Sequence, residues 1–119
     1  MAVLDPDQEH FRCDGMTVVR LEGEIDIATA ESVFAGLASA VVENCTVVDL
    51  SAVEFIDASG VNALVGALRI ASGSQRHLLL ASPPRQLRRI LDVLDLHGVL
   101  PTHDDAAAAC ASHAGHAVH

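Results

Sequence analysis

Two kinds of apolar pattern alternate along this chain and limit the folds open to it. Segments 46–50 (TVVDL) and 77–81 (HLLLA) are short apolar runs, typical of strands buried on both faces of a parallel sheet. In 28–42, from 61 onward and in 82–94, apolar residues instead recur at spacings of three and four, which predicts amphipathic helices. Strands that alternate with helices imply right-handed crossovers and a largely parallel sheet. The expected fold class is α/β, a mixed but mostly parallel β-sheet with packed helices.

The N-terminal part adds a hairpin to this pattern. Asp14-Gly15 separates runs at 10–13 and 16–22, and Asp-Gly between alternating residues is a strong signal for a tight turn between antiparallel strands. The alternation in the second run predicts a strand with both faces partly covered. Asp26 or Thr29 is expected to cap the helix that follows.

The C-terminal part should contribute one short strand and one more helix. Gly98 is expected to end the third helix, and 99–101 to form a brief edge strand. A last helix should then begin with Thr102 or Asp104 as its cap. The predicted order of elements is ββαβαβα(β)α.

The length of the chain suits one domain. Compact domains commonly have about 100 to 150 residues, and residues 1–119 show neither an internal repeat nor a linker. We expect a core over about 10–112, with loose ends at 1–8 and 112–119. Three Phe, no Trp and no Tyr make that core aliphatic and argue against a surface that stacks on nucleic-acid bases.

The charge balance also narrows the choice of partners. Sixteen Asp and Glu against seven Arg, with no Lys, give a formal net charge of −9, which repels polyphosphate backbones. Nucleic acid is therefore not an expected partner. Twelve of the sixteen carboxylates lie at or before Asp57, while five of the seven arginines lie between Arg69 and Arg89. This asymmetry fits either a protein partner or a solvated face.

Several features indicate a cytoplasmic protein without a membrane segment. No apolar run approaches the roughly 18 to 20 residues of a membrane span, and the acidic, polar N-terminus is unlike a signal peptide. The three cysteines are widely spaced and lack a C-x-x-C pair, as in reduced cytosolic proteins. Cys13 and Cys45 are expected to be buried, and Cys110 to be the exposed candidate for oxidation. A redox role for the cysteines stays open.

The segment EFIDASGVNAL, at 54–64, joins the buried strand predicted at 46–50 to the helix predicted from 61 onward. Asp57 is placed where its carboxylate would accept a hydrogen bond from an amide of the first helical turn. Ala58, Ser59 and Gly60 would form that turn, and their small side chains leave the backbone approachable at the positive end of the helix dipole. The alternative is a purely structural junction, an Asp-capped helix with small residues for close packing.

Other chemistry has weaker support in the sequence. Ser59 lies between a strand and a helix but lacks the G-x-S-x-G elbow of hydrolases, and no histidine is tied to it by spacing. His113, His116 and His119 recur every three residues, yet they lie in a tail expected to be loose. We therefore expect no cofactor, no metal site and no enzymatic activity, with a small hydrolase as the less favoured alternative.

Three stretches in order resemble the STAS-domain family, the anti-sigma factor antagonists of bacterial partner-switching systems. LEGEIDIATAE at 21–31 looks like the family stretch L-x-G-x-[LI]-D-x-x-[TS]-A. VVDLSAVEFIDASGVNALV at 47–65 resembles the most specific family motif, D-L-S-x-[VL]-x-[FY]-[IM]-D-S-S-G-[LV] with its flanking strand and helix. SPPRQLRRILDVLDLHGVL at 82–100 is similar to the third family helix and the turn after it.

The resemblance implies a protein-binding role in transcription regulation. In this family the unphosphorylated antagonist binds an anti-sigma factor that is also a serine kinase, which frees a sigma factor. By position, Asp26, Asp57, Ser59 and Gly60 match the partner-binding surface, and Asn62 would complete it. The implied partner is thus an anti-sigma factor of the serine-kinase type, and the sequence leaves open whether the chain is a monomer or a weak dimer.

One position departs from the family pattern. The serine that is usually phosphorylated is the first of D-S-S-G, and here that position is Ala58. Three readings follow: constitutive binding, Ser59 as a substitute phosphorylation site, or a role without a kinase. Because adjacent helical residues point about 100° apart, we favour constitutive binding over Ser59. A STAS module in a scaffold or sensor assembly is the alternative function.

Overall fold

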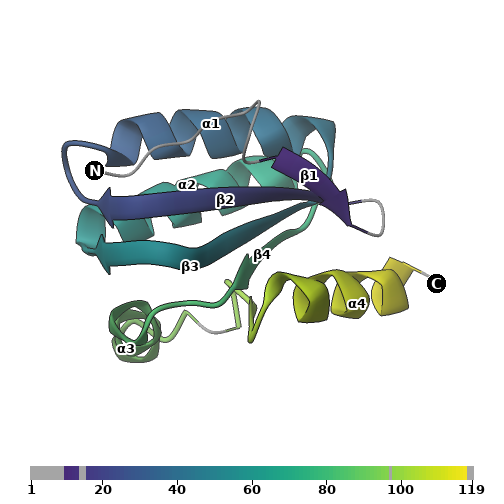
Figure 1. Cartoon of the computed structure of the whole chain (residues 1–119). Helices are drawn as coiled ribbons and strands as arrows, with labels where there is room; N and C mark the ends of the chain where they lie inside the picture. Colours follow the sequence, from purple (N-terminus) through teal and green to yellow (C-terminus); the bar gives the residue numbers. More distant parts are fainter. Residues whose placement is uncertain (1–9, 14–15, 97, 118–119) are drawn as a thin grey trace.

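The computed structural model describes residues 10–13, 16–96 and 98–117, which form one sheet and four helices (Figure 1). The strands are β1 (His10–Cys13), β2 (Met16–Ile25), β3 (Thr46–Ile56), β4 (Leu78–Ala81) and β5 (Thr102–His103), and the helices are α1 (Ala30–Glu43), α2 (Ala58–Gly73), α3 (Arg85–Val93) and α4 (Ala106–Ala117). The strands lie in the order β1-β2-β3-β4-β5, with β1 antiparallel to β2 and all other pairs parallel. The predicted fold class and element order are confirmed. No helix in the described part of the chain is long and apolar enough to cross a membrane.

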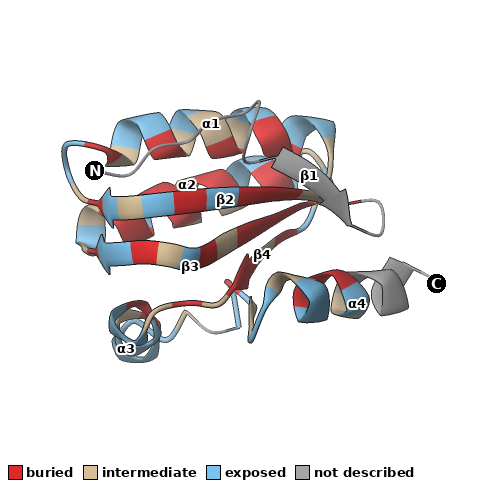
Figure 2. Ribbon diagram, viewed as in Figure 1, coloured by how far each residue is buried: buried red, intermediate tan, exposed pale blue. Residues whose placement is uncertain are grey.

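The core lies on both faces of the sheet because successive strand residues point to opposite sides. On β2, Val19 and Leu21 belong to a buried cluster that includes residues of α1, α2 and α3. Met16 and Val18 belong to a second cluster, completed by α4 on the other face. Figure 2 shows the resulting pattern, in which buried stripes of the helices alternate with exposed ones. The predicted burial of both faces of this strand is confirmed.

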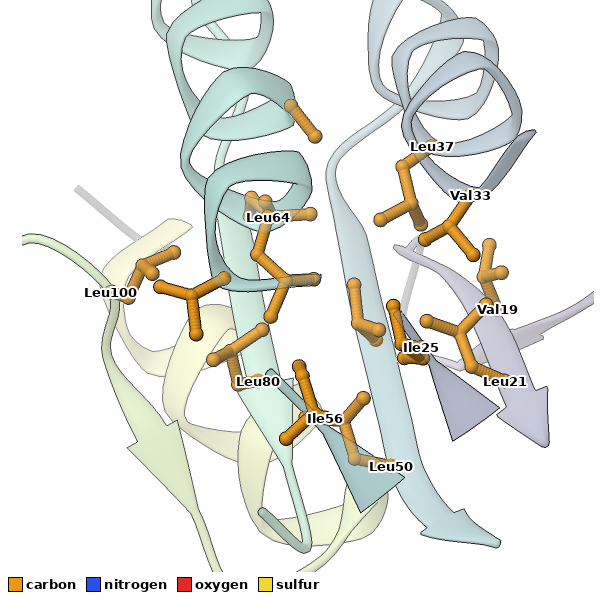
Figure 3. Close-up of a cluster of buried hydrophobic side chains, with 14 of the residues drawn as sticks. Val19, Leu21, Ile25, Val33, Leu37, Leu50, Ile56, Leu64, Leu80 and Leu100 are labelled. Atoms are coloured by element: carbon orange, nitrogen blue, oxygen red, sulfur yellow. The ribbon is translucent and has the colours of Figure 1, made fainter. Parts of the chain in front are cut away.

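The larger cluster is built almost entirely from aliphatic side chains, as expected from the scarcity of aromatic residues. Figure 3 shows Val33 and Leu37 of α1 beside Val19 of β2, and Leu64 of α2 above β3 and β4. All four of these side chains are at most 1% exposed. Burial of an aliphatic side chain of this size contributes about 1.5 to 3 kcal/mol.

Strand β3 is longer than the apolar run at 46–50 predicted. After Leu50 its residues become partly exposed, yet the strand continues to Ile56 because it still pairs with β2. The register between the two strands shifts twice, between Arg20 and Glu22 and between Gly23 and Glu24. The ladder therefore extends to the end of both strands, and β2 also runs beyond residue 22.

The boundary predicted for the third helix was wrong. α3 ends at Val93, and Asp95 then adopts a φ of 55°, a left-handed conformation that terminates the helix before Gly98. The brief edge strand is also displaced from its predicted position at 99–101. It is β5, whose two residues Thr102 and His103 pair with Leu80 and Ala81 of β4.

The start of the last helix also differs from the prediction. Thr102 lies in β5, and the helix α4 begins only at Ala106. Its first turn is capped by Asp105, whose Oδ1 accepts a hydrogen bond from the amide of Ala108 at 2.7 Å, and not by Asp104. The helix continues to Ala117, beyond residue 112, where a loose end was expected to begin.

The burial of the cysteines differs from the prediction as well. Cys110 is fully buried and not the exposed thiol that was expected, because it lies on the side of α4 that packs against the sheet beside Val18 and Val47. Cys45 is half-buried, and its sulfur accepts a hydrogen bond from the amide of His77 at 3.2 Å. The side chain of Cys13 lies outside the described residues.

Candidate functional site

The two predicted site segments meet at one end of the sheet. Ile25 and Ile56, the last residues of β2 and β3, are paired in the parallel ladder. The amide of Asp57 donates a hydrogen bond to the carbonyl of Ile25 at 3.2 Å, so the turn after β3 is tied directly to the end of β2. Asp26 follows Ile25 in the chain, and both aspartates are half-buried. The structure therefore brings Asp26 and Asp57 to the same edge, at the left of Figure 1.

Asp57 caps α2 as the sequence predicted. It has extended backbone angles, and its Oδ1 accepts hydrogen bonds from the amides of Ser59 at 2.9 Å and Gly60 at 3.1 Å. These two bonds satisfy donors that have no partner within the helix. The same carboxylate occupies the amides that would otherwise face an anion, and it adds a negative charge there. A phosphate on Ser59, whose amide donates to this carboxylate, would lie close to the same negative charge.

Gly60 is required by the close approach of α2 to the ends of β2 and β3. A methyl group at this position would come within 2.6 Å of Ile56 Cγ1 and 2.8 Å of the carbonyl oxygen of Ile25. Contacts under 3.0 Å to a backbone atom force the structure to shift. This glycine thus permits the tight packing that holds the first turn of α2 against the sheet.

The other residues of the junction differ in their access to solvent. Ala58 and Asn62 are exposed, Ser59 is half-buried, and Gly60 is buried. Ala58 and Asn62 are four residues apart and so lie on one face of the helix. The predicted site residues after β3 thus form a surface of small side chains, with the methyl group of Ala58 open to solvent.

The loop between β2 and α1 is held by a hydrogen-bond network around Thr29. Its hydroxyl donates to the carbonyl of Glu24 at 2.9 Å and accepts from the amide of Asp26 at 3.0 Å. Thr29 occupies the N-cap position of α1, but its side chain makes no capping bond to the helix. Asp26 Oδ1 accepts from the amide of Ala28 at 3.0 Å, which closes a short turn. The prediction that Asp26 or Thr29 caps this helix was therefore wrong, because both side chains bond within the loop instead.

Three residues near the site were missed by the sequence reasoning. Ile27, between the two polar loop residues, is 83% exposed, and Phe55 at the end of β3 is 40% exposed. Gln86 of α3 accepts a hydrogen bond from the amide of Ile56 at 3.2 Å and so joins α3 to the junction. No local pattern marks Gln86, because its partner lies thirty residues away in the chain. The position of Ile27 between Asp26 and Thr29, the two proposed caps, was the available signal in the sequence.

A metal site would need clustered ligands, and a hydrolase would need a nucleophile beside its base. In the described residues, no group of three or more His, Cys, Asp and Glu side chains could hold a metal ion. His113, His116 and His119 have side chains outside the described part. The interaction of Ser59 that the structure shows is the hydrogen bond from its amide to Asp57 Oδ1 at 2.9 Å, which leaves the hydrolase alternative without geometric support.

The fold defines a small α/β domain, and its family follows from comparison. The model of the STAS domain matches residues 11–109, which is most of the chain. The chain therefore belongs to the STAS-domain family, as the three sequence stretches indicated.

Solved structures of the same fold cover almost the whole chain. An anti-sigma factor antagonist from Mycobacterium paratuberculosis is 24% identical, with a TM-score of 0.80, over 94% of this chain and 93% of that one. An anti-sigma-factor antagonist (STAS) domain protein from Planctomyces limnophilus is 20% identical, with a TM-score of 0.72, over 94% and 98%. The Bacillus cell fate determinant SpoIIAA, in its phosphorylated form, is 19% identical, with a TM-score of 0.64, over the full length of both chains. No curated protein matches the chain.

Proposed function

We propose that this chain is an anti-sigma factor antagonist of the cytoplasm, which acts by binding and not by catalysis. Its partner would be an anti-sigma factor of the serine-kinase type, and complex formation would free a sigma factor for transcription. The support comes from the STAS family membership and from similar folds that are described as anti-sigma factor antagonists. The binding surface would consist of Asp26 and the first turn of α2, from Asp57 to Asn62.

One observation carries the proposed mode of action. Ala58 occupies the position of the phosphorylated family serine, is exposed in the first turn of α2, and has no hydroxyl to accept a phosphate. Ser59 has a hydroxyl but is half-buried, and its amide is bound by Asp57. A kinase that reaches the position of Ala58 would therefore find no acceptor. We infer that binding is constitutive, with modification of Ser59 as the competing reading.

The missing phosphate would matter energetically. A phosphoserine carries roughly −1.5 to −2 charges at neutral pH. Each charge unit that opposes a partner carboxylate ~6 Å away, at an effective dielectric constant of ~20, costs on the order of 3 kcal/mol. This is about a hundredfold loss of affinity. A chain that cannot be phosphorylated at position 58 would keep its partner where a phosphorylated antagonist releases it.

The proposal is tested by affinity capture from a lysate of the source cell, followed by mass spectrometry of the bound proteins and of the peptide that contains Ser59. Recovery of a kinase-type anti-sigma factor with Ser59 unmodified supports constitutive antagonism. Phosphorylated Ser59 would instead make Ser59 the switch. A large stable assembly without an anti-sigma factor would favour the scaffold alternative, and ester hydrolysis abolished by Ser59→Ala would favour the hydrolase.

A second variant tests the role of position 58 directly. Ala58→Ser should restore phosphorylation by the captured kinase and release of the complex, because it restores an exposed hydroxyl at the family position. The double variant Ala58→Ser, Ser59→Ala is the matched control, since it keeps only the restored hydroxyl. If Ala58→Ser stays unmodified beside an active cognate kinase, the assignment of this position is wrong.

A further inference from the structure

The end of the sheet that carries the two aspartates has an apolar centre. Ile27 has the largest exposed fraction, 83%, of the exposed large hydrophobic residues in the described part of the chain. Ala58 is also exposed. It lies at the same end of the sheet as Ile27, because the turns that contain them follow Ile56 and Ile25, which are paired in the ladder. The two apolar groups thus flank the point where β2 and β3 end together.

Ile27 is held in place by a network in which its own side chain takes no part. The neighbouring Asp26 and Ala28 are joined by the bond from the Ala28 amide to Asp26 Oδ1, and Thr29 anchors the loop to the carbonyl of Glu24. A loop whose backbone is already fixed loses little backbone freedom when a partner covers it, so that mainly the rotamers of the Ile27 side chain remain to be ordered. The loop therefore presents Ile27 in a form suited to insertion into a recess.

The charges that β2, β3 and the turns after them contribute to this apolar centre all have one sign, whereas α3, which reaches the junction through Gln86, contributes Arg85 beside it. Between Arg20 and Arg69, residues 21–68 contain eight carboxylates and no Lys, Arg or His. Four of these carboxylates lie within two residues of the ends of β2 and β3, at Glu24, Asp26, Glu54 and Asp57. An apolar centre with a polar rim is the usual anatomy of a protein interface. The complementary surface would carry arginine or lysine around an apolar recess.

We propose that Ile27 is the apolar anchor of the partner interface, and that it inserts into a recess of the anti-sigma factor rimmed by arginine or lysine. The inference rests on the proposed function and adds the residue and the chemistry by which the partner would be held. A few central apolar residues usually dominate the binding energy of an interface, while the surrounding polar rim contributes selectivity and association rate.

The test compares Ile27→Ala with Val93→Ala in binding to the purified anti-sigma factor recovered by capture. Val93 is a matched control because it is also a strongly exposed aliphatic residue, 77%, but lies at the end of α3 that is remote from Gln86 and the junction. We expect Ile27→Ala to weaken binding by about 10-fold to 50-fold, the loss for three buried carbon groups. Val93→Ala should leave the affinity unchanged, and both variants should keep the thermal stability of the wild type.

The rim is tested by the association rate at two ionic strengths. Between roughly 30 mM and 300 mM salt the rate should fall severalfold, because attraction between opposite charges is screened at the higher concentration. Equal affinity of Ile27→Ala and the wild type would overturn the anchor but leave the proposed function intact, and a rate that rises with salt would overturn the basic rim. If the wild-type chain binds no kinase-type anti-sigma factor, both the inference and the proposed function fall.

Discussion

The close approach at Gly60 leads to a quantitative expectation for Gly60→Ala. Alanine favours a helix over glycine by up to about 1 kcal/mol, so the change would be stabilising if the site had room. Here the new methyl group would contact Ile56 Cγ1 at 2.6 Å, Ile25 Cγ2 at 2.9 Å and the Ile25 carbonyl oxygen at 2.8 Å. That oxygen accepts the hydrogen bond from the Asp57 amide and cannot move away without weakening it.

The clash should outweigh the gain in helix propensity. Overpacking of a well-packed core typically costs about 1 to 3 kcal/mol, and a rigid backbone contact favours the upper part of this range. We expect a net loss of about 2 kcal/mol in the free energy of unfolding, equivalent to roughly 8 °C in Tm for a domain of this size. Urea denaturation followed by far-ultraviolet circular dichroism is the suitable assay, since the chain has no Trp or Tyr for fluorescence.

Gly73→Ala is the matched control, at the last residue of the same helix. A methyl group there has nothing within 4 Å, so the variant should be as stable as the wild type or more stable by up to about 1 kcal/mol. If Gly60→Ala proves as stable as Gly73→Ala, the turn at the end of β3 can move to accept the methyl group at little cost in free energy. The reasoning that α2 is fixed tightly against the sheet would then be refuted.

Two further expectations concern the cap and the thiols. Asp57→Ala should lower the free energy of unfolding by about 1 kcal/mol through loss of the cap, whereas Asp57→Asn should retain most of it because asparagine is an equally good cap; urea titrations of the two variants that coincide would contradict this. In the native protein a thiol reagent should modify half-buried Cys45 well before buried Cys110, as followed by mass spectrometry. The reverse order would show that the packing of α4 on the sheet does not cover Cys110.

The order of elements and the Asp57 cap were predictable because they depend on local patterns. The alternation of apolar residues, the turn signal at Asp14-Gly15 and the aspartate before three small residues each act within a few positions of the chain. The buried side of Cys110 was not predictable, because an alanine-rich helix gives almost no apolar periodicity to identify its packed face. The end of α3 was misplaced for a different reason. Asp95 takes the left-handed conformation that ends the helix, a role that the sequence suggested for Gly98.

The candidate site was predictable in its members but not in its shape. Asp26 and Asp57 could be placed at one edge by the parallel order of their strands, together with the family resemblance. The bond between Gln86 and the end of β3 depends on the packing of α3, which no local pattern specifies. The exposure of Ile27 depends likewise on the network around Thr29, which no local pattern specifies. From the sequence alone, an isoleucine is by default assigned to the core.

The register shifts in the β2–β3 ladder make the length of β3 a determinant of the binding surface. From Thr46 to Ile56 the strand advances ten residues, while β2 advances eight from Thr17 to Ile25, and yet the two strands end level. The surplus residues thus set how far the Asp57 turn projects beyond the sheet. Loss of a single one would withdraw the turn by about 3.3 Å and point Ile56 away from the core. Residues in the middle of a strand thereby fix the position of the surface that we propose for partner binding.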